Sequence, residues 1–248
     1  MVTDPMPAPQ LNPTTVPRLL LASASPRRHD ILRQLGLNHD VVVPPSPDGE
    51  DEPQLAGEDA HDYVVRTARE KVQRTVVWLK NITAEQMDTQ AQGEENQPST
   101  HRSPAHTALS LSGPELFNAF ILAADTTVIA DGEILGKPKN QDHAADMLRQ
   151  LSGSQHKVTT AIALWHGGKL LEDVVSTTVE FANLSDSEIN AYCATDEPMG
   201  KAGAYGIQGR AAAFVRHISG SYFNVVGLPA YETVALLKEA GYPTKGSN

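Results

Sequence analysis

Two kinds of hydrophobic pattern alternate along the chain and indicate an α/β fold. Unbroken apolar runs at 19–22 and 119–124 are typical of buried strands. In segments 58–79 and 141–151, apolar residues recur every three or four positions, as on the buried face of a helix. A chain of 248 residues with both kinds of element is long enough for one α/β domain with a sizeable core.

Shorter segments complete the predicted set of elements. The strand at 19–22 is followed by a helix that Gly36 can end, and a hairpin is predicted around the turn Asp131-Gly132. The other predictions are strands at 40–43, 157–165, 170–181 and 214–219, a turn at 220–222, and helices at 185–194 and 229–240.

Three stretches lack a periodic pattern and are expected to lie outside the packed part of a domain that we place at 18–242. Residues 1–17 contain five prolines, without the basic start and apolar core of a signal peptide, so we expect a disordered tail. Residues 81–115 contain no aromatic residue and are dominated by Gln, Ser, Thr, Gly and Pro, which predicts a flexible insertion without core contacts. Residues 243–248 are expected to form a short tail.

Charge and cysteine content narrow the class of protein. The chain has 30 acidic and 20 basic residues, and a net charge of -10 argues against nucleic acid or an anionic membrane as a partner. No apolar run approaches the roughly 20 residues that span a bilayer. The single cysteine, Cys193, excludes an internal disulfide and suits a reducing compartment. We therefore expect a cytoplasmic protein in which any phosphate site is local.

The segment 23–28, Ser-Ala-Ser-Pro-Arg-Arg, joins the first strand to the first helix. Ser25 suits the N-cap, and Pro26 suits the first helical position. A first helical turn normally favours acidic residues, yet this one carries Arg27 and Arg28 and no carboxylate. Unpaired backbone N–H groups, hydroxyls and guanidinium groups together can cradle a phosphate. The segment alone supports this reading and a solvated arginine pair equally.

Carboxylates occur at two places that could serve chemistry. Asp125 follows the apolar run 119–124, so we expect it at the end of a core strand, where it caps a turn, pairs with an arginine, or serves as a metal ligand or a base. An acidic cluster is either a solvated loop or a source of oxygen ligands for a divalent cation. The cluster consists of Asp48, Glu50, Asp51 and Glu52.

Lysines and glycines mark three further candidates. Lys71 borders the apolar stripe of the predicted helix 58–79 and could reach into a cleft, although an exposed helix lysine is commoner. Lys137 lies in a Gly-Lys-Pro turn whose spacing does not fit a P-loop. Glycines recur every third residue at 200, 203, 206 and 209, which indicates a close backbone approach. Lys201 and Gln208 are the functional candidates in that segment, and Gln208 can both donate and accept hydrogen bonds.

Four motifs in this order resemble the Maf family, known as septum-formation inhibitors and nucleoside triphosphate pyrophosphatases. They are Leu-Ala-Ser-Ala-Ser-Pro-Arg-Arg at 21–28, Ala-Asp-Thr at 124–126, Leu-Gly-Lys-Pro at 135–138, and Lys-Ala-Gly-Ala-Tyr-Gly-Ile-Gln-Gly at 201–209, followed by Gly-Ser-Tyr and Val-Gly-Leu-Pro. The resemblance implies a two-lobed α/β fold with a mixed sheet and a central cleft, similar to inosine triphosphatases. One departure is Gly200, where close relatives carry aspartate.

The resemblance also assigns expected roles. It makes Asp125 the proton acceptor. The expected chemistry uses a divalent cation, Mg²⁺ or Mn²⁺, for which Asp125 and Glu52 of the acidic cluster are the candidate ligands. The expected triphosphate contacts are Ser23, Ser25, Arg28, Lys71 and Lys137.

Base selectivity is implied by three further positions, Arg27, Thr126 and Gln208, which look like those of the dTTP/UTP subgroup. The expected reaction converts a nucleoside triphosphate to the monophosphate and pyrophosphate. Two alternatives stay open at this point: a 7-methyl-GTP pyrophosphatase, whose subgroup has a bulky aromatic residue in place of Arg27, and a non-enzymatic septum-formation regulator that binds a protein. The sequence also leaves open whether the protein is a homodimer.

Overall fold

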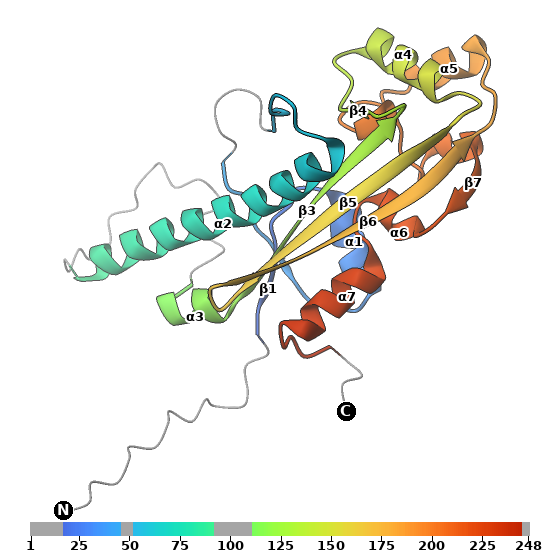
Figure 1. The fold of residues 1–248 in the computed structure, drawn as a ribbon. Coiled ribbons are helices and arrows are strands. Elements are labelled where there is room, and N and C mark those ends of the chain that lie inside the picture. Colours follow the sequence, from blue (N-terminus) through green and yellow to red (C-terminus); the bar gives the residue numbers. More distant parts are fainter. Residues whose placement is uncertain (1–16, 46–51, 92–110, 245–248) are drawn as a thin grey trace, which may run out of the picture.

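A seven-stranded mixed sheet forms the centre of the part of the chain that the computed structural model describes, residues 17–45, 52–91 and 111–244 (Figure 1). The strand order is β2-β1-β3-β5-β6-β7, and β4 pairs with β3 beside this path. β1 runs parallel to both of its neighbours, and the other pairs are antiparallel. The strands are β1 (Leu19–Leu21), β2 (Asp40–Val41), β3 (Phe120–Ala130), β4 (Glu133–Leu135), β5 (Gln155–His166), β6 (Lys169–Phe181) and β7 (Val215–Ser219).

Helices cover both faces of this sheet (Figure 1). One face packs against α2 and α3, and the other against α1, α4, α5 and α7. The α-helices are α1 (Pro26–Gln34), α2 (Ala60–Ala91), α3 (Gly113–Asn118), α4 (Gln141–Leu151), α5 (Asp186–Cys193), α6 (Tyr222–Val226) and α7 (Ala230–Glu239), and two 3-10 helices are η2 (Ala202–Ala204) and η3 (Arg210–Phe214).

The long strand β3 shows how the sheet separates two cores. Side chains alternate between the faces of a strand. Ile121 and Ala123 therefore join the apolar cluster of α2, whereas Leu122, Ala124 and Val128 join the cluster of α1 and α4. Both clusters are closed to water, so the two faces of β3 lie in different packing layers.

The strands β3, β5 and β6 are longer than the others and reach a second lobe. β3 pairs with β5 from Ile121 to Ile129, beyond the three-residue contact of β3 with β1. At the far end of these strands, Figure 1 shows β4, α4 and α5 gathered together. The predicted mixed α/β fold is confirmed in this arrangement. Among the described residues, no helix combines the length and apolarity needed to cross a membrane.

The segment 81–115 differs from the sequence-based expectation at both of its ends. The helix expected to end near 79 continues to Ala91, because Ile82 and Thr83 extend its buried stripe. Leu111 is also buried, and the Thr83 hydroxyl donates a hydrogen bond to its carbonyl oxygen at 3.1 Å. Ser112 then caps α3 through a capping box with Glu115. The expectation that this segment makes no core contacts was therefore wrong for Ile82, Thr83 and Leu111. Residues 92–110, like the tails 1–16 and 245–248, lie outside the described residues.

Two smaller expectations also need correction. Asp125 was expected at the end of a strand, but β3 continues through it to Ala130. The β-branched residues Thr126 and Thr127 favour a strand, and both are paired in register with β5. The turn expected at 220–222 is the start of α6, with Ser221 as its N-cap.

Candidate active site

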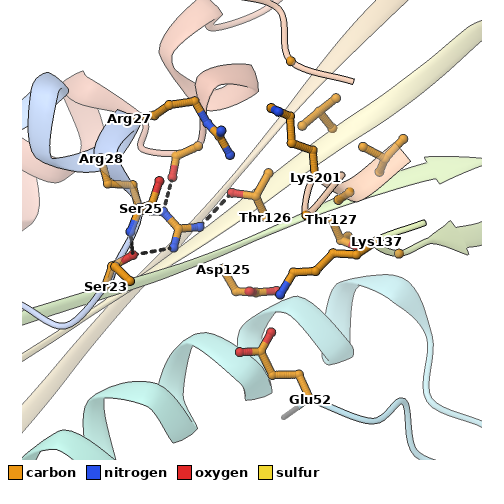
Figure 2. Close-up of a pocket in the computed structure, with 18 of the residues that line it drawn as sticks. Ser23, Ser25, Arg27, Arg28, Glu52, Asp125, Thr126, Thr127, Lys137 and Lys201 are labelled. Atoms are coloured by element: carbon orange, nitrogen blue, oxygen red, sulfur yellow. Dashed lines mark hydrogen bonds between the residues drawn. The ribbon is translucent and has the colours of Figure 1, made fainter. Parts of the chain in front are cut away.

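A cavity of about 860 Å³ opens where the loop before α1, the middle of β3, the turn after β4 and the glycine-rich segment meet (Figure 2). Segments far apart in the sequence thus form one site. The structure brings together all ten site residues expected from the sequence. They are Ser23, Ser25, Arg27, Arg28, Glu52, Lys71, Asp125, Thr126, Lys137 and Gln208.

The loop that leads into α1 presents hydroxyl groups to the cavity. Ser25 is the N-cap of α1 with Pro26 at the start of the helix, yet its side chain makes no capping hydrogen bond. The first turn contains no acidic residue, so no carboxylate within the turn offsets its positive dipole end. The Ser23 hydroxyl accepts a hydrogen bond from the Ser25 backbone N–H at 3.2 Å. This bond fixes the shape of the loop at a helix N-terminus, a place where proteins commonly bind anions.

Arg28 connects three walls of the cavity. Its Nε donates to the Gly227 carbonyl oxygen at 2.8 Å, its Nη1 to the Ser23 hydroxyl at 3.1 Å, and its Nη2 to the Thr126 hydroxyl at 3.1 Å. Burial lowers the pKa of Arg28, and the negative charge of Asp125 opposes that shift. A guanidinium has five N–H donors. Two of them remain for a ligand after these three bonds, so Arg28 both braces the site and carries charge into it.

A charged triad lies on the α2 side of β3. Lys71 Nζ on α2 is 2.6 Å from Asp125 Oδ1 and 2.6 Å from Glu52 Oε1. Asp125 reaches this side because odd-numbered residues of β3 face α2. The lysine between the two carboxylates offsets their mutual repulsion. Lys71, expected as a triphosphate contact, is thus engaged with Asp125 and Glu52 in this structure.

The glycine-rich segment forms the opposite wall, where Lys201 points into the cavity (Figure 2). Its ammonium donates to the Glu197 carbonyl oxygen, and burial together with the Arg27 charge lowers the pKa of Lys201. A Cβ atom at Gly206 would lie 3.0 Å from Lys201 Cε, so glycine makes room for the lysine stem. Gly203 has φ +67°, and a Cβ there would be 2.9 Å from Val128. The predicted close backbone approach is therefore an approach to the protein's own side chains.

Lys137 and Gln208 lie at more open parts of the same cavity. Lys137 follows β4, is exposed, and points toward the part of the cavity that Asp125 lines (Figure 2). Gln208 is also exposed, so both its amide donor and its carbonyl acceptor can reach a bound molecule.

Sequence reasoning missed a row of buried polar groups behind Thr126. The Thr126 hydroxyl is 2.9 Å from that of Thr160 on β5, and Thr160 donates to the backbone carbonyl of Asn224 at 3.0 Å. Thr160 and Asn224 are both fully buried. The available signal for Thr160 was a polar residue on the core-facing row of β5, between Val158 and Ile162, because buried polar groups need hydrogen-bond partners. The partner is a backbone atom from a distant helix, which the sequence does not reveal.

Glu52 and Asp125 are the carboxylates lining the cavity that could hold a divalent cation. In the described ranges there is no group of three or more His, Cys, Asp or Glu side chains placed to hold a metal. Asp48, Glu50 and Asp51 of the acidic cluster lie outside those ranges. Mg²⁺ is commonly bound by one or two carboxylates together with substrate phosphates and water. Two carboxylates beside a cavity large enough for a whole small-molecule ligand fit that mode of binding.

Comparison with known proteins gives this fold and cavity a family. A family model described as Maf-like protein matches residues 18–240. The chain belongs to the Maf family. The resemblance expected from the four motifs is thereby confirmed, and the match spans both lobes of the fold.

Maf relatives with close similarity share one name. A protein of Bordetella parapertussis is 49% identical over 225 residues, covering 91% of this chain and 93% of the relative, and is named dTTP/UTP pyrophosphatase. A protein of the same name from Anaeromyxobacter dehalogenans is 42% identical over 231 residues, covering 92% and 96%. A third, from Salmonella typhimurium, is 42% identical over 219 residues, covering 88% and 91%.

Proposed function

We propose that this Maf protein is a nucleoside triphosphate pyrophosphatase that hydrolyses dTTP and UTP to the monophosphate and pyrophosphate. The observation that carries the proposal is the convergence of several cationic groups and two carboxylates, Asp125 and Glu52, on a single cavity, in a chain whose net charge is -10. Such a distribution favours a small polyanion over nucleic acid. The shared name of the relatives supports the same substrate class.

The reaction needs a water molecule to attack the α-phosphorus while the bond to the bridging oxygen breaks and pyrophosphate leaves. Asp125 orients this water and accepts its proton. A divalent cation held by Asp125 and Glu52 would supply positive charge to the phosphate oxygens and lower the pKa of water. Arg28 and Lys137 neutralise the charge that develops on the leaving group. Lys71 holds the two carboxylates in place and adds a third positive charge to the cavity.

We assign the reading of the base to Arg27, Thr126 and Gln208, which line the same cavity. Thymine and uracil present an alternating edge of acceptor, donor and acceptor, which Gln208 can match with its amide. The subgroup for 7-methyl-GTP differs by an aromatic residue where this chain has Arg27, so a methylated purine is disfavoured. Modified pyrimidine triphosphates with the same edge are further substrates under this proposal. Nucleotides are cytoplasmic metabolites, and we place the enzyme there.

The proposal is tested by pyrophosphate release from purified protein with Mg²⁺ or Mn²⁺. The panel consists of dTTP, UTP, CTP, GTP and 7-methyl-GTP. We expect dTTP and UTP to have the highest kcat/KM, since buried groups left unpaired with a wrong base can cost as much as about 10⁴-fold. A preference for a purine nucleotide, or release of orthophosphate in place of pyrophosphate, would contradict the proposal.

A further inference from the structure

We infer that Thr160 is a positioning residue that fixes the Thr126 hydroxyl as a hydrogen-bond acceptor toward the nucleotide base. The inference rests on the proposed function and deepens it, because it explains how this site would distinguish uracil from cytosine. Thr160 is fully buried and lies behind the cavity wall, whereas Thr126 lines the cavity. Thr160 can therefore act on a bound base only through Thr126.

Counting protons determines the direction of each hydrogen bond in this row. The Asn224 backbone carbonyl can only accept, so the 3.0 Å contact requires Thr160 to donate its single hydroxyl proton there. Thr160 must then accept across the 2.9 Å contact with Thr126. The one proton of Thr126 is used in that bond. The reverse assignment would place two acceptors 3.0 Å apart in a buried site, which is unfavourable.

The acceptor at the end of the row is held rigidly. The Asn224 side-chain amide donates to the Val158 carbonyl at 2.8 Å and to the Thr177 hydroxyl at 2.9 Å. The same Asn224 backbone carbonyl also accepts from the Gly227 N–H at 3.0 Å, where α6 ends. Because these partners are buried, Thr160 has little freedom to turn its proton back toward Thr126.

On the cavity side, the Thr126 hydroxyl can only accept a hydrogen bond from a ligand. Its oxygen accepts from Arg28 Nη2 at 3.1 Å, which leaves one lone pair and no proton for a ligand. A group that donates can bind there, and a group that only accepts is repelled. The inference places ring nitrogen N3 of the base against this oxygen. N3 carries a proton in thymine and uracil, whereas in cytosine it is a bare acceptor. The row of hydroxyls thus favours an imide edge and disfavours cytosine.

The test compares kcat/KM for UTP and CTP in wild type and in Thr160→Val, which removes the hydroxyl at nearly constant volume. With its proton released, Thr126 can donate to cytosine. We expect the UTP/CTP ratio to fall by about tenfold or more, mainly through faster CTP hydrolysis. Thr160→Ser keeps the hydroxyl and should retain the wild-type ratio. A ratio does not depend on the fraction of folded enzyme, so a modest loss of stability leaves the test intact.

Thr159→Val is the matched control. Thr159 is the neighbouring buried residue of β5, and its hydroxyl contacts Ser176 at 2.7 Å, away from Thr126. This variant should keep the wild-type UTP/CTP ratio. If Thr160→Val does not fold, Thr160→Ala removes the same hydroxyl with less bulk and is measured in its place.

The outcomes separate the inference from the proposed function. A wild type that prefers UTP, combined with an unchanged ratio in the variant without the Thr160 hydroxyl, overturns the inference alone. A ratio that falls equally in Thr159→Val also overturns it, because the effect would then be general to β5. A wild type that hydrolyses UTP and CTP equally overturns both the inference and the proposed base preference.

Discussion

The two faces of β3 differ in the kind of polar group that they carry. Asp125 faces α2 and joins a triad of full charges with Lys71 and Glu52. Its neighbour Thr126 faces the opposite layer, where it meets one guanidinium and a row of uncharged hydroxyl and carbonyl groups that ends at Asn224. Because strand residues alternate between faces, adjacent positions of one strand can supply two different groups: a proton acceptor for hydrolysis and a hydrogen-bond partner for the nucleobase.

The difference between the faces has a physical consequence. Ionic partners can be exchanged when another ion arrives, so the Asp125 face can respond to a metal and a triphosphate. The hydroxyl row has a fixed direction because each oxygen has one proton to give. We therefore expect changes on the first face to alter rate for every nucleotide, and changes on the second to alter the choice between nucleotides.

The largest expected effect is that of Asp125→Asn, which keeps the shape of the side chain and removes its charge. A general base typically contributes about 10²–10⁴-fold, so kcat should fall by that range for all nucleotides alike. Lys71 still has Glu52 as a partner in this variant, so the fold should persist, as circular dichroism can verify. Turnover close to that of wild type would rule out the assigned role.

Next in size is the effect of Leu111→Ala on the free energy of unfolding. This variant tests whether Leu111 stabilises α2, the helix that carries the charged face. Leu111 packs in the same apolar cluster as Leu79 and Val72 of α2, the helix that carries Lys71. Truncating a buried leucine typically lowers the free energy of unfolding by about 2–5 kcal/mol. Val77→Ala on the exposed side of α2 is the control and should cost less than 1 kcal/mol, by rough estimate. Equal urea midpoints for the two variants would mean that 111 is not part of the core.

This region also shows what the sequence could and could not provide. The apolar run before Asp125 and the start of α1 at Pro26 are local patterns, and both elements begin where expected, although β3 continues past Asp125 to Ala130. The end of α2 was missed because its stripe is completed by Leu111, a partner across a segment of polar composition. The composition of a segment indicates whether the segment can fold alone. It does not show whether a residue of that segment packs against another part of the chain.

The candidate site, too, could be predicted from the sequence only in part. Hydroxyl, arginine and lysine positions could be predicted from four motifs, since each motif is short and contiguous. The contacts between motifs could not, because Lys71 bridges two carboxylates from other segments and Thr160 bonds to a backbone atom of α6. A backbone carbonyl carries no residue identity, so no sequence pattern points to it.

A further expected effect concerns pH and the uncharged face. His156 on β5 lies on the same side as Thr160, and its Nε2 is 2.8 Å from the hydroxyl of Tyr205 in the glycine-rich segment. Burial lowers the pKa of His156 to about 4 from the model-peptide value of 6.5. The folded state keeps this imidazole neutral, while the unfolded state binds a proton below 6.5. The contribution of His156 to the free energy of unfolding should thus be fully present above pH 6.5. That free energy should fall by about 3 kcal/mol as the pH approaches 4.

Urea unfolding of wild type and His156→Gln across pH 7 to 4 measures this linkage. The variant has no group that titrates at this position, so its stability should decline less steeply over that interval. Parallel curves for the two proteins would show that His156 is not held neutral by burial.

The most direct test of the division between the two faces measures kcat/KM for UTP and CTP side by side in wild type, Asp125→Asn and Thr126→Val. We predict that Asp125→Asn lowers both values by a similar factor and keeps their ratio within about twofold. Thr126→Val should lower the UTP/CTP ratio by about tenfold or more while CTP hydrolysis persists. A changed ratio in Asp125→Asn, or an equal loss for both nucleotides in Thr126→Val, would contradict the account.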